Sequence, residues 1–170
     1  MEIKKNLVLL GMMGVGKTVI GKKVAKKLKV NFFDIDRIIE KKNDMKISEI
    51  FKIKGENYFR KEEELITLKY LDKKKSIVSL GGGAFINDKI RKKILSDSIS
   101  VWLNVNLETL YKRLKKNNRR PLINKNIQND IHKIFSERKK TYSLADHEIN
   151  CNNINLMQIV NKVVKIYEKN

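Results

Sequence analysis

The chain has 170 residues, and its single cysteine, Cys151, excludes an intramolecular disulfide and a multi-cysteine zinc site. Hydrophobic residues make up 41% of the chain and charged residues 34%, which is typical of one globular domain. The formal net charge of +19 is compatible with nucleic-acid binding or with a lysine-rich, solvated surface. Because the lysines are spread along the chain without interleaved aromatic residues, we favour the solvated surface and expect no nucleic-acid partner.

The apolar stretch at residues 7–15 is the longest in the chain, and it is too short to span a membrane. Basic residues precede it, as they do in a signal peptide, but no small-residue cleavage pattern follows. We therefore expect a cytoplasmic protein with no membrane partner, in agreement with the lack of paired cysteines.

Short apolar runs alternate with longer amphipathic segments along the chain. This pattern predicts strands at residues 6–10, 31–36, 76–80, 98–105 and 147–151. It predicts helices at about residues 20–28, 47–71 (one helix or two), 87–95, 107–116 and 156–167, and one that ends at about residue 142. Strands that alternate with helices favour an α/β fold in which helices cover both faces of a parallel sheet. Residues 117–129 are polar, hold the only proline and are the best candidate for a mobile loop.

Residues 11–18, with the sequence GMMGVGKT, match the pattern G-x-x-x-x-G-K-[ST] of a phosphate-binding P-loop. Its glycines let several backbone N–H groups point into one concavity, where phosphate oxygens are bound. Lys17 is placed to reach the β- and γ-phosphates, and the hydroxyl of Thr18 is placed to ligate Mg²⁺. The alternative is a glycine-rich turn in a small core, which the strand before the motif and the amphipathic segment after it make less favourable.

Asp34 and Asp36 end the second predicted strand, and residues two apart in a strand point to the same side of a sheet. Both carboxylates are then expected in one region beyond the strand. One could bind water around Mg²⁺, and the other could orient or deprotonate an acceptor hydroxyl. The alternative is that Asp36 caps a helix, because it directly precedes Arg37 and two isoleucines. The spacing does not decide between these roles.

Three consecutive glycines at residues 81–83 end the third predicted strand. They suit either a close approach of a ligand to the backbone or a tight turn into the next helix. Arg60 precedes Glu63 by three positions on a predicted helix, so an ion pair is its simplest interpretation. Arg138 lies in a basic segment for which a solvated helix face is the simplest interpretation. Spacing alone singles out neither arginine as a ligand-binding residue.

Taken together, these motifs resemble the shikimate kinase family, small P-loop kinases related in fold to the nucleoside monophosphate kinases. The resemblance runs from about residue 5 to residue 155 and rests on several motifs in a fixed order. They are the P-loop at residues 11–18, Phe33-Asp34-Ile35-Asp36, Gly55-Glu56 with Phe59-Arg60 and Glu63, Gly81 to Ala84, Arg113 with Arg120-Pro121-Leu122, and Arg138 with Tyr142 and Ala145. This set is much more specific than a P-loop alone.

The resemblance implies a three-layer α/β/α P-loop fold, with a five-stranded parallel sheet and a mobile lid, in one domain over residues 1–170. The lid corresponds to about residues 117–129, and an acceptor-binding helical region corresponds to about residues 37–65. The implied reaction transfers the γ-phosphoryl of ATP to the 3-hydroxyl of shikimate, giving shikimate 3-phosphate and ADP in aromatic amino acid biosynthesis. The implied enzyme uses Mg²⁺ and acts as a monomer.

The resemblance also implies a role for each matching residue. The nucleotide-binding residues would be Gly14, Val15, Gly16, Lys17, Thr18, Val19, Arg113, Arg120 and Asn152. The shikimate-binding residues would be Asp36, Arg60, Gly81, Gly82, Gly83 and Arg138. The catalytic residues would be Lys17, Asp36 and Arg120, and the metal ligands would be Thr18 and Asp34. Both Arg60 and Arg138 would hold the shikimate carboxylate, Arg113 would stack on adenine, and Arg120 would move in with the lid.

Two features depart from the family pattern. Residues 151–155 lack the arginine or proline that members often place against adenine, so we expect adenine contacts there to run through the backbone and Asn152. A doubled arginine, Arg119 and Arg120, stands at the lid. We assign the lid role to Arg120 because it directly precedes the proline and keeps the family's spacing from Arg113.

Two other functions stay open at this point. A P-loop kinase for gluconate or for a nucleoside monophosphate would use the same loop, and a sugar acid also carries a carboxylate and hydroxyls. A basic nucleic-acid-binding ATPase would account for the net charge of +19. ADP release measured with each acceptor separates the first alternative from shikimate kinase. Stimulation of ATP turnover by nucleic acid would identify the second.

Overall fold

The sheet that organises the molecule has five parallel strands in the order β2-β3-β1-β4-β5. It is seen in a computed structural model that describes residues 5–115 and 127–170. The strands are β1 (Asn6–Leu10), β2 (Asn31–Asp34), β3 (Ser76–Ser79), β4 (Ser98–Asn104) and β5 (His147–Asn150). All five lie at or within the predicted ranges, so the α/β fold class with a parallel sheet is confirmed.

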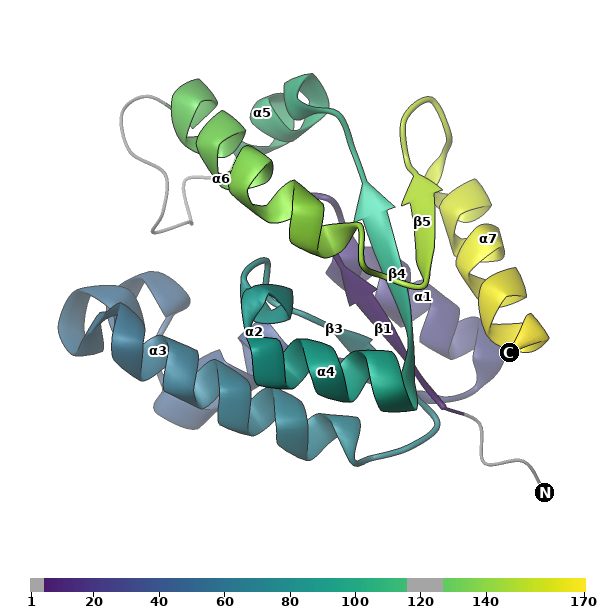
Figure 1. Ribbon diagram of the computed structural model, residues 1–170, viewed down its shortest axis with the longest axis horizontal. Helices are drawn as coiled ribbons and strands as arrows, with labels where there is room; N and C mark the ends of the chain where they lie inside the picture. The colour runs from purple at the N-terminus through teal and green to yellow at the C-terminus, as the bar shows by residue number, and fades with distance from the viewer. Residues whose placement is uncertain (1–4, 116–126) are drawn as a thin grey trace.

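Helices cover both faces of this sheet (Figure 1). They are α1 (Lys17–Leu28), α2 (Ile35–Asn43), α3 (Ile47–Leu71), the 3₁₀ turn η1 (Ala84–Ile86), α4 (Asp88–Asp97), α5 (Leu107–Lys115), α6 (Ile127–Tyr142) and α7 (Leu156–Lys169). Helices α1 and α7 pack together on one face, whereas α4 packs on β4 from the other face and contacts α3. None of the helices in the two described ranges combines the length and apolar character that crossing a membrane requires.

The central strand β1 explains why the apolar runs predicted the sheet so well. Its residues Leu7, Val8 and Leu9 have no exposed surface, because helices cover both faces of a parallel sheet and leave no polar side. Strand β1 pairs with β3 on one side and with β4 on the other. The chain therefore changes direction across the sheet at β1, and the carboxyl end of a strand at such a switch point is where α/β folds bind ligands.

The end of β2 corrects one prediction. Residues 35 and 36 are not part of the strand, because α2 begins at Ile35. The side chain of Asp34 accepts a hydrogen bond from the backbone N–H of Arg37 at 3.2 Å and so caps α2. The helix-capping carboxylate is thus Asp34, and Asp36 lies in the first turn of the helix. The argument that both side chains share one side of a strand was wrong.

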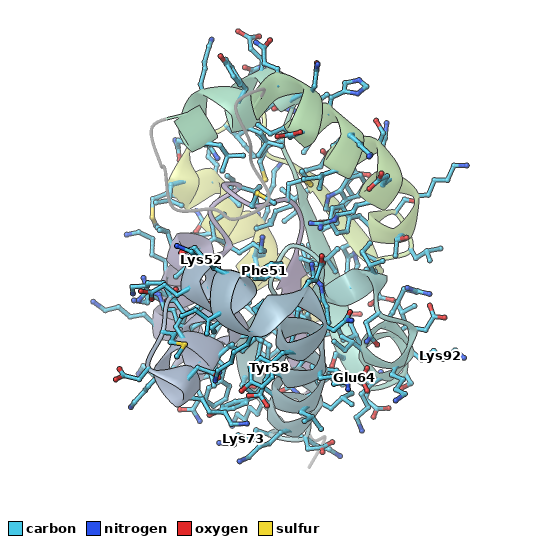
Figure 2. All side chains as sticks on the ribbon, turned by 90° about the vertical axis from the view of Figure 1, so that its left-hand side faces the viewer. Phe51, Lys52, Tyr58, Glu64, Lys73 and Lys92 are labelled. Carbon is cyan, nitrogen blue, oxygen red and sulfur yellow. The ribbon has the colours of Figure 1, made fainter. Side chains whose placement is uncertain are left out.

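Helix α3 is interrupted at Gly55, whose backbone angles are φ 82° and ψ 167°. These angles are open to glycine and strained for other residues, so the sequence can break the helix there without ending it. Figure 2 faces this helix and labels Phe51 and Tyr58, which lie on the two sides of the break. Residues 47–71 thus form one continuous helical element, as one alternative predicted, with a break at Gly55 that divides it in two, as the other predicted.

The segment predicted as a mobile lid, residues 117–129, lies mostly outside the described residues. Its last three residues belong to α6, which begins at Ile127, so the predicted loop extended too far toward the carboxyl terminus. Arg119 and Arg120 also lie outside the described residues.

Candidate active site

The P-loop connects the carboxyl end of β1 to the amino terminus of α1. Gly14 and Gly16 have φ values of 80° and 101°, which only glycine adopts without strain, and Gly16 is the residue that caps α1. The backbone N–H groups in the first turn of α1 therefore point toward the loop, and they favour the binding of an anion there. The geometry is that of a phosphate-binding loop, as the motif predicted.

Lys17 lies at the centre of this loop and is only 8% exposed. Its Nζ donates hydrogen bonds to the backbone oxygens of Gly11 at 2.7 Å and Met12 at 2.9 Å. Those carbonyls hold the ammonium group over the loop. A bound phosphoryl group would offer a more strongly charged acceptor at the same place.

The neighbouring Thr18 brings two elements together. Its hydroxyl donates a hydrogen bond to Oδ2 of Asp34 at 2.5 Å, which ties the start of α1 to the end of β2. The pair offers a hydroxyl and a carboxylate oxygen beside the phosphate loop. Mg²⁺ prefers hard oxygen ligands and completes its shell with phosphates and water, so this donor set fits it. Within the described residues there is no cluster of three or more acidic, histidine or cysteine side chains that could hold a metal alone.

Three further residues predicted to bind nucleotide occupy different positions around the loop. Arg113 reaches back from α5, and its Nη1 donates to the backbone oxygens of Gly14 at 3.3 Å and Val15 at 3.2 Å. Val19 is half exposed on the first turn of α1. Asn152 follows β5, where its Oδ1 accepts a hydrogen bond from the backbone N–H of Asn106 at 2.9 Å and so joins two loops at the same end of the sheet.

The triple-glycine turn follows β3, directly beside the P-loop. A Cβ atom on Gly82 would lie 3.4 Å from the backbone nitrogen of Met13 in the P-loop and 3.3 Å from Nη1 of Arg138. A Cβ atom on Gly83 would lie 2.6 Å from Nη1 of Arg60. Two arginines that are 78 positions apart in the sequence therefore meet over the same turn, and the missing side chains make room for them.

Arg60 is held in place by two carboxylates of its own helix. Its Nη1 donates to Glu63 at 2.6 Å, and its Nε and Nη2 each donate to one oxygen of Glu56 at 3.2 Å. The predicted ion pair with Glu63 is therefore confirmed, and it coexists with a position over the glycine turn. Burial lowers the pKa of Arg60, but the two carboxylates outweigh burial, so its pKa is raised and the guanidinium stays charged.

Glu63 is a member of this site to which the sequence analysis assigned no role beyond pairing with Arg60. It is 2% exposed, and among the described residues its Oε1 has no hydrogen-bond partner. A Cβ atom on Gly81 would lie 2.5 Å from that oxygen and 2.6 Å from Oδ1 of Asp36, so the two carboxylates converge on the turn. Burial raises the pKa of Glu63 against the opposing charge of Arg60, and the negative charge of Asp36 raises it further. The available signals were its spacing to Arg60 and its place in the motif that begins at Gly55.

Tyr142 also lies in this site, and its motif drew attention to it without suggesting a role. Its side chain has no exposed surface, and its hydroxyl donates a hydrogen bond to the backbone oxygen of Gly82. Burial raises the pKa of the Tyr142 hydroxyl, while the charge of Arg138 and a hydrogen bond with it oppose that rise. Because Tyr142 and Arg138 are four positions apart on α6, they share one face of that helix.

Cys151 lies just beyond β5 and is buried. Its thiol contacts the backbone oxygen of Ile149 at 3.3 Å, and burial raises its pKa to about 11. The thiolate is therefore scarce at neutral pH, and the residue has no feature of a catalytic nucleophile.

A phosphate loop at the switch point of a parallel sheet, next to a turn that two arginines approach, defines the protein as a P-loop kinase. Comparison with known proteins narrows the class further. Residues 13–168 match the family described as shikimate kinase. The chain belongs to the shikimate kinase family.

Individual relatives agree with this assignment. The chain is 39% identical to the shikimate kinase of Persephonella marina over 160 residues, which cover 94% of this chain and 97% of that protein. Among solved structures, shikimate kinase from Acinetobacter baumannii in complex with shikimate has a TM-score of 0.92 at 28% identity and covers 97% of this chain and 93% of that one. A gluconokinase from Sinorhizobium meliloti has a TM-score of 0.61 at 13% identity, over 99% of this chain and 94% of that one, and shares the fold alone.

Proposed function

We propose that the protein phosphorylates the 3-hydroxyl of shikimate with ATP, giving shikimate 3-phosphate and ADP for aromatic amino acid biosynthesis. Family membership supports the reaction. The observation that carries the choice of acceptor is the approach of Arg60 and Arg138 to one glycine turn beside the P-loop. Planar guanidinium groups bind a carboxylate through paired hydrogen bonds, and shikimate carries one carboxylate.

On the nucleotide side, the P-loop amides from Gly14 to Thr18 would bind the phosphates of ATP. Lys17 would exchange its two carbonyl acceptors for the transferring phosphoryl group and balance the charge that develops on it. Thr18 and Asp34 would hold Mg²⁺, directly or through water. When bound, that ion neutralises phosphate charge and orients the phosphoryl group for in-line transfer.

The adenine would lie between the loops that follow β4 and β5. Arg113 extends from α5 to the P-loop carbonyls, so its guanidinium is at the edge of the region that a nucleoside would occupy. Asn152 accepts a hydrogen bond from Asn106 and so joins the loops after β4 and β5. The half-exposed Val19 would offer an apolar contact to the nucleoside. We propose that Arg120 completes this set from the lid. We expect closure of the lid to exclude water and so to prevent simple hydrolysis of ATP.

On the acceptor side, Arg60 and Arg138 would hold the shikimate carboxylate, with backbone N–H groups of Gly81, Gly82 and Gly83 completing the clamp. Asp36 would accept a hydrogen bond from the reacting hydroxyl and is the candidate general base. Its carboxylate approaches the same turn as the guanidinium groups, which supports a role in orienting the acceptor.

We further propose one domain over residues 1–170 that acts as a cytoplasmic monomer and needs no nucleic acid. Some of the basic side chains pair with acidic ones, although such pairs leave the net charge of +19 unchanged: Lys42 pairs with Glu62 at 2.8 Å, and Lys93 pairs with Asp97 at 2.8 Å. Ion pairs of this kind are common on a charge-rich protein surface.

The decisive experiment measures ADP release with ATP and Mg²⁺ in the presence of shikimate, gluconate, AMP or single-stranded RNA. A Lys17→Ala variant controls for contaminating kinases. We expect turnover with shikimate that the variant lacks. Activity with gluconate or AMP but not with shikimate would keep the P-loop chemistry and reject the proposed acceptor. Stimulation by RNA would reject the proposal that no nucleic acid takes part.

A further inference from the structure

The glycine turn after β3 can adopt several backbone conformations, so other groups must hold it in one of them. Three consecutive glycines carry no side chains that could restrict their backbone, and glycine has more accessible conformations than any other residue. Two of the three carbonyls are fixed by the following turn: that of Gly81 accepts from the N–H of Ala84 at 3.2 Å, and that of Gly83 accepts from the N–H of Ile86 at 3.0 Å. The carbonyl of Gly82 accepts from a side chain instead, the hydroxyl of Tyr142.

That hydrogen bond has a geometric consequence. A trans peptide unit is planar, and its C=O and N–H groups point in opposite directions. Holding the carbonyl of Gly82 toward Tyr142 therefore turns the N–H of Gly83 away from Tyr142. Rotation of the same peptide unit would reverse both groups. The hydroxyl of Tyr142 thus selects one of the orientations that the glycines allow.

The same hydroxyl lies near the second anchor of the site. Arg138 is four positions before Tyr142 on α6 and so shares its face of the helix, and Nη1 of Arg138 lies 3.3 Å from the position that a Cβ on Gly82 would take. The ring of Tyr142 packs against the ring of Trp102, with 5.9 Å between the two ring centroids. A rigid, fully buried phenol thus connects α6 to the turn.

We propose that the Tyr142 hydroxyl is a positioning group for the acceptor: it fixes the Gly82–Gly83 peptide and the Arg138 guanidinium in the arrangement that binds the acceptor's carboxylate. Tyr142 acts through these groups and is not itself a catalytic residue. The identity of the acceptor in this inference rests on the proposed function. The orientation of the turn does not, because it follows from the hydrogen bond between Tyr142 and Gly82.

The test is Tyr142→Phe, which removes the hydroxyl and keeps the ring that packs on Trp102. Because the Gly82 carbonyl loses its hydrogen bond and Arg138 loses a polar neighbour, we expect the KM for shikimate to rise about five- to tenfold. The KM for ATP and kcat should change less than about twofold, since the P-loop contacts are kept. The matched control is Tyr167→Phe, which removes the hydroxyl of a buried tyrosine on α7 and should leave both KM values unchanged.

A second measurement does not depend on the acceptor. Amide hydrogen exchange followed by mass spectrometry should show faster exchange in the peptide that holds residues 80–86 of Tyr142→Phe, and not in that peptide of Tyr167→Phe. Unchanged exchange together with an unchanged KM for shikimate would overturn the proposal, and so would an equal rise of both KM values. If the unmodified protein shows no turnover with shikimate, the proposed function fails, and the exchange result alone decides whether Tyr142 orders the turn.

Discussion

The hydroxyl of Thr18 lies 2.5 Å from Oδ2 of Asp34, so the first turn of the P-loop helix is tied to the end of a strand on the edge of the sheet. The same aspartate caps α2 with its other oxygen. One side chain therefore contacts both the helix that follows the P-loop and the helix that carries Asp36. In the function proposed above, the nucleotide and acceptor halves of the site would share this carboxylate.

This link makes Thr18 a sensitive position. Thr18→Ser should retain activity, because serine keeps the hydroxyl, whereas Thr18→Val keeps the shape and loses it. We expect Thr18→Val to weaken the apparent Mg²⁺ affinity roughly 10- to 100-fold. The measurement is the rate of ADP release over a range of Mg²⁺ concentrations. Equal Mg²⁺ dependence in the serine and valine variants would contradict the proposed metal site.

Lys17→Ala should lower kcat by roughly 100- to 1000-fold, since a preorganised cation at the transferring group is lost. The fold should remain, because the hydrogen bonds of the ammonium group to the carbonyls of Gly11 and Met12 lie within the P-loop itself. Lys22→Ala, an exposed position on the same helix, is the matched control. Comparable rates in the two variants would show that Lys17 does not act on the phosphoryl group.

Gly83→Ala should weaken acceptor binding without unfolding the protein. The new Cβ would lie 2.6 Å from Nη1 and 3.0 Å from Cζ of Arg60, so the guanidinium would be displaced from the turn. A flexible side chain can move at little cost, and we therefore expect a similar melting temperature and a KM for shikimate raised about tenfold or more. Gly21→Ala provides the contrast. Its Cβ would lie 2.4 Å from the ring of Phe32, which packs against the core, so this variant should have a lower melting temperature.

Glu63 should make the free energy of unfolding depend on pH. Its pKa is raised above the ordinary value of 4.5, chiefly by burial, so the folded state binds the proton more tightly than the unfolded state does. Stability should then fall as the pH rises from about 4.5 through the folded-state pKa, and Glu63→Gln should reduce that fall.

The neighbouring Glu64 is the matched control for this prediction. Hydrogen bonds from Asn87 and Lys89 lower its pKa, so its contribution should be present above pH 4.5 and lost on acidification. Urea titrations from about pH 3 to pH 8 would measure both variants, because the Glu64 contribution is lost only below pH 4.5. Parallel pH profiles for Glu63→Gln and Glu64→Gln would contradict the opposite shifts.

Much of the fold could be predicted because the three central strands, β3, β1 and β4, are buried on both faces and stand out in the sequence as apolar runs. The P-loop could be predicted because its spacing is specific and its context is a strand followed by a helix. The boundary at Asp34 could not, since the same two aspartates suit a strand end and a helix cap. The geometry of the α2 cap decides between them, and the capping residue is Asp34 rather than Asp36.

The acceptor side was accessible only through the family resemblance. Arg60 and Arg138 are far apart in the sequence, and each has a simpler interpretation as a surface residue. Only the packing of α3 and α6 around η1 brings them to the glycine turn. Tyr142 is harder still, because no spacing rule indicates which carbonyl a buried hydroxyl will meet. Such residues become visible when hydrogen bonds can be followed across elements.

The buried thiol of Cys151 has a practical consequence for studying the motion of this enzyme. With no other cysteine in the chain and a pKa of about 11, the protein is almost unreactive toward maleimides at neutral pH. A cysteine introduced at the exposed Ile53 of α3 would therefore accept a fluorophore at that position alone. Energy transfer from Trp102, the only tryptophan, would then report how far α3 moves relative to the sheet when substrates bind.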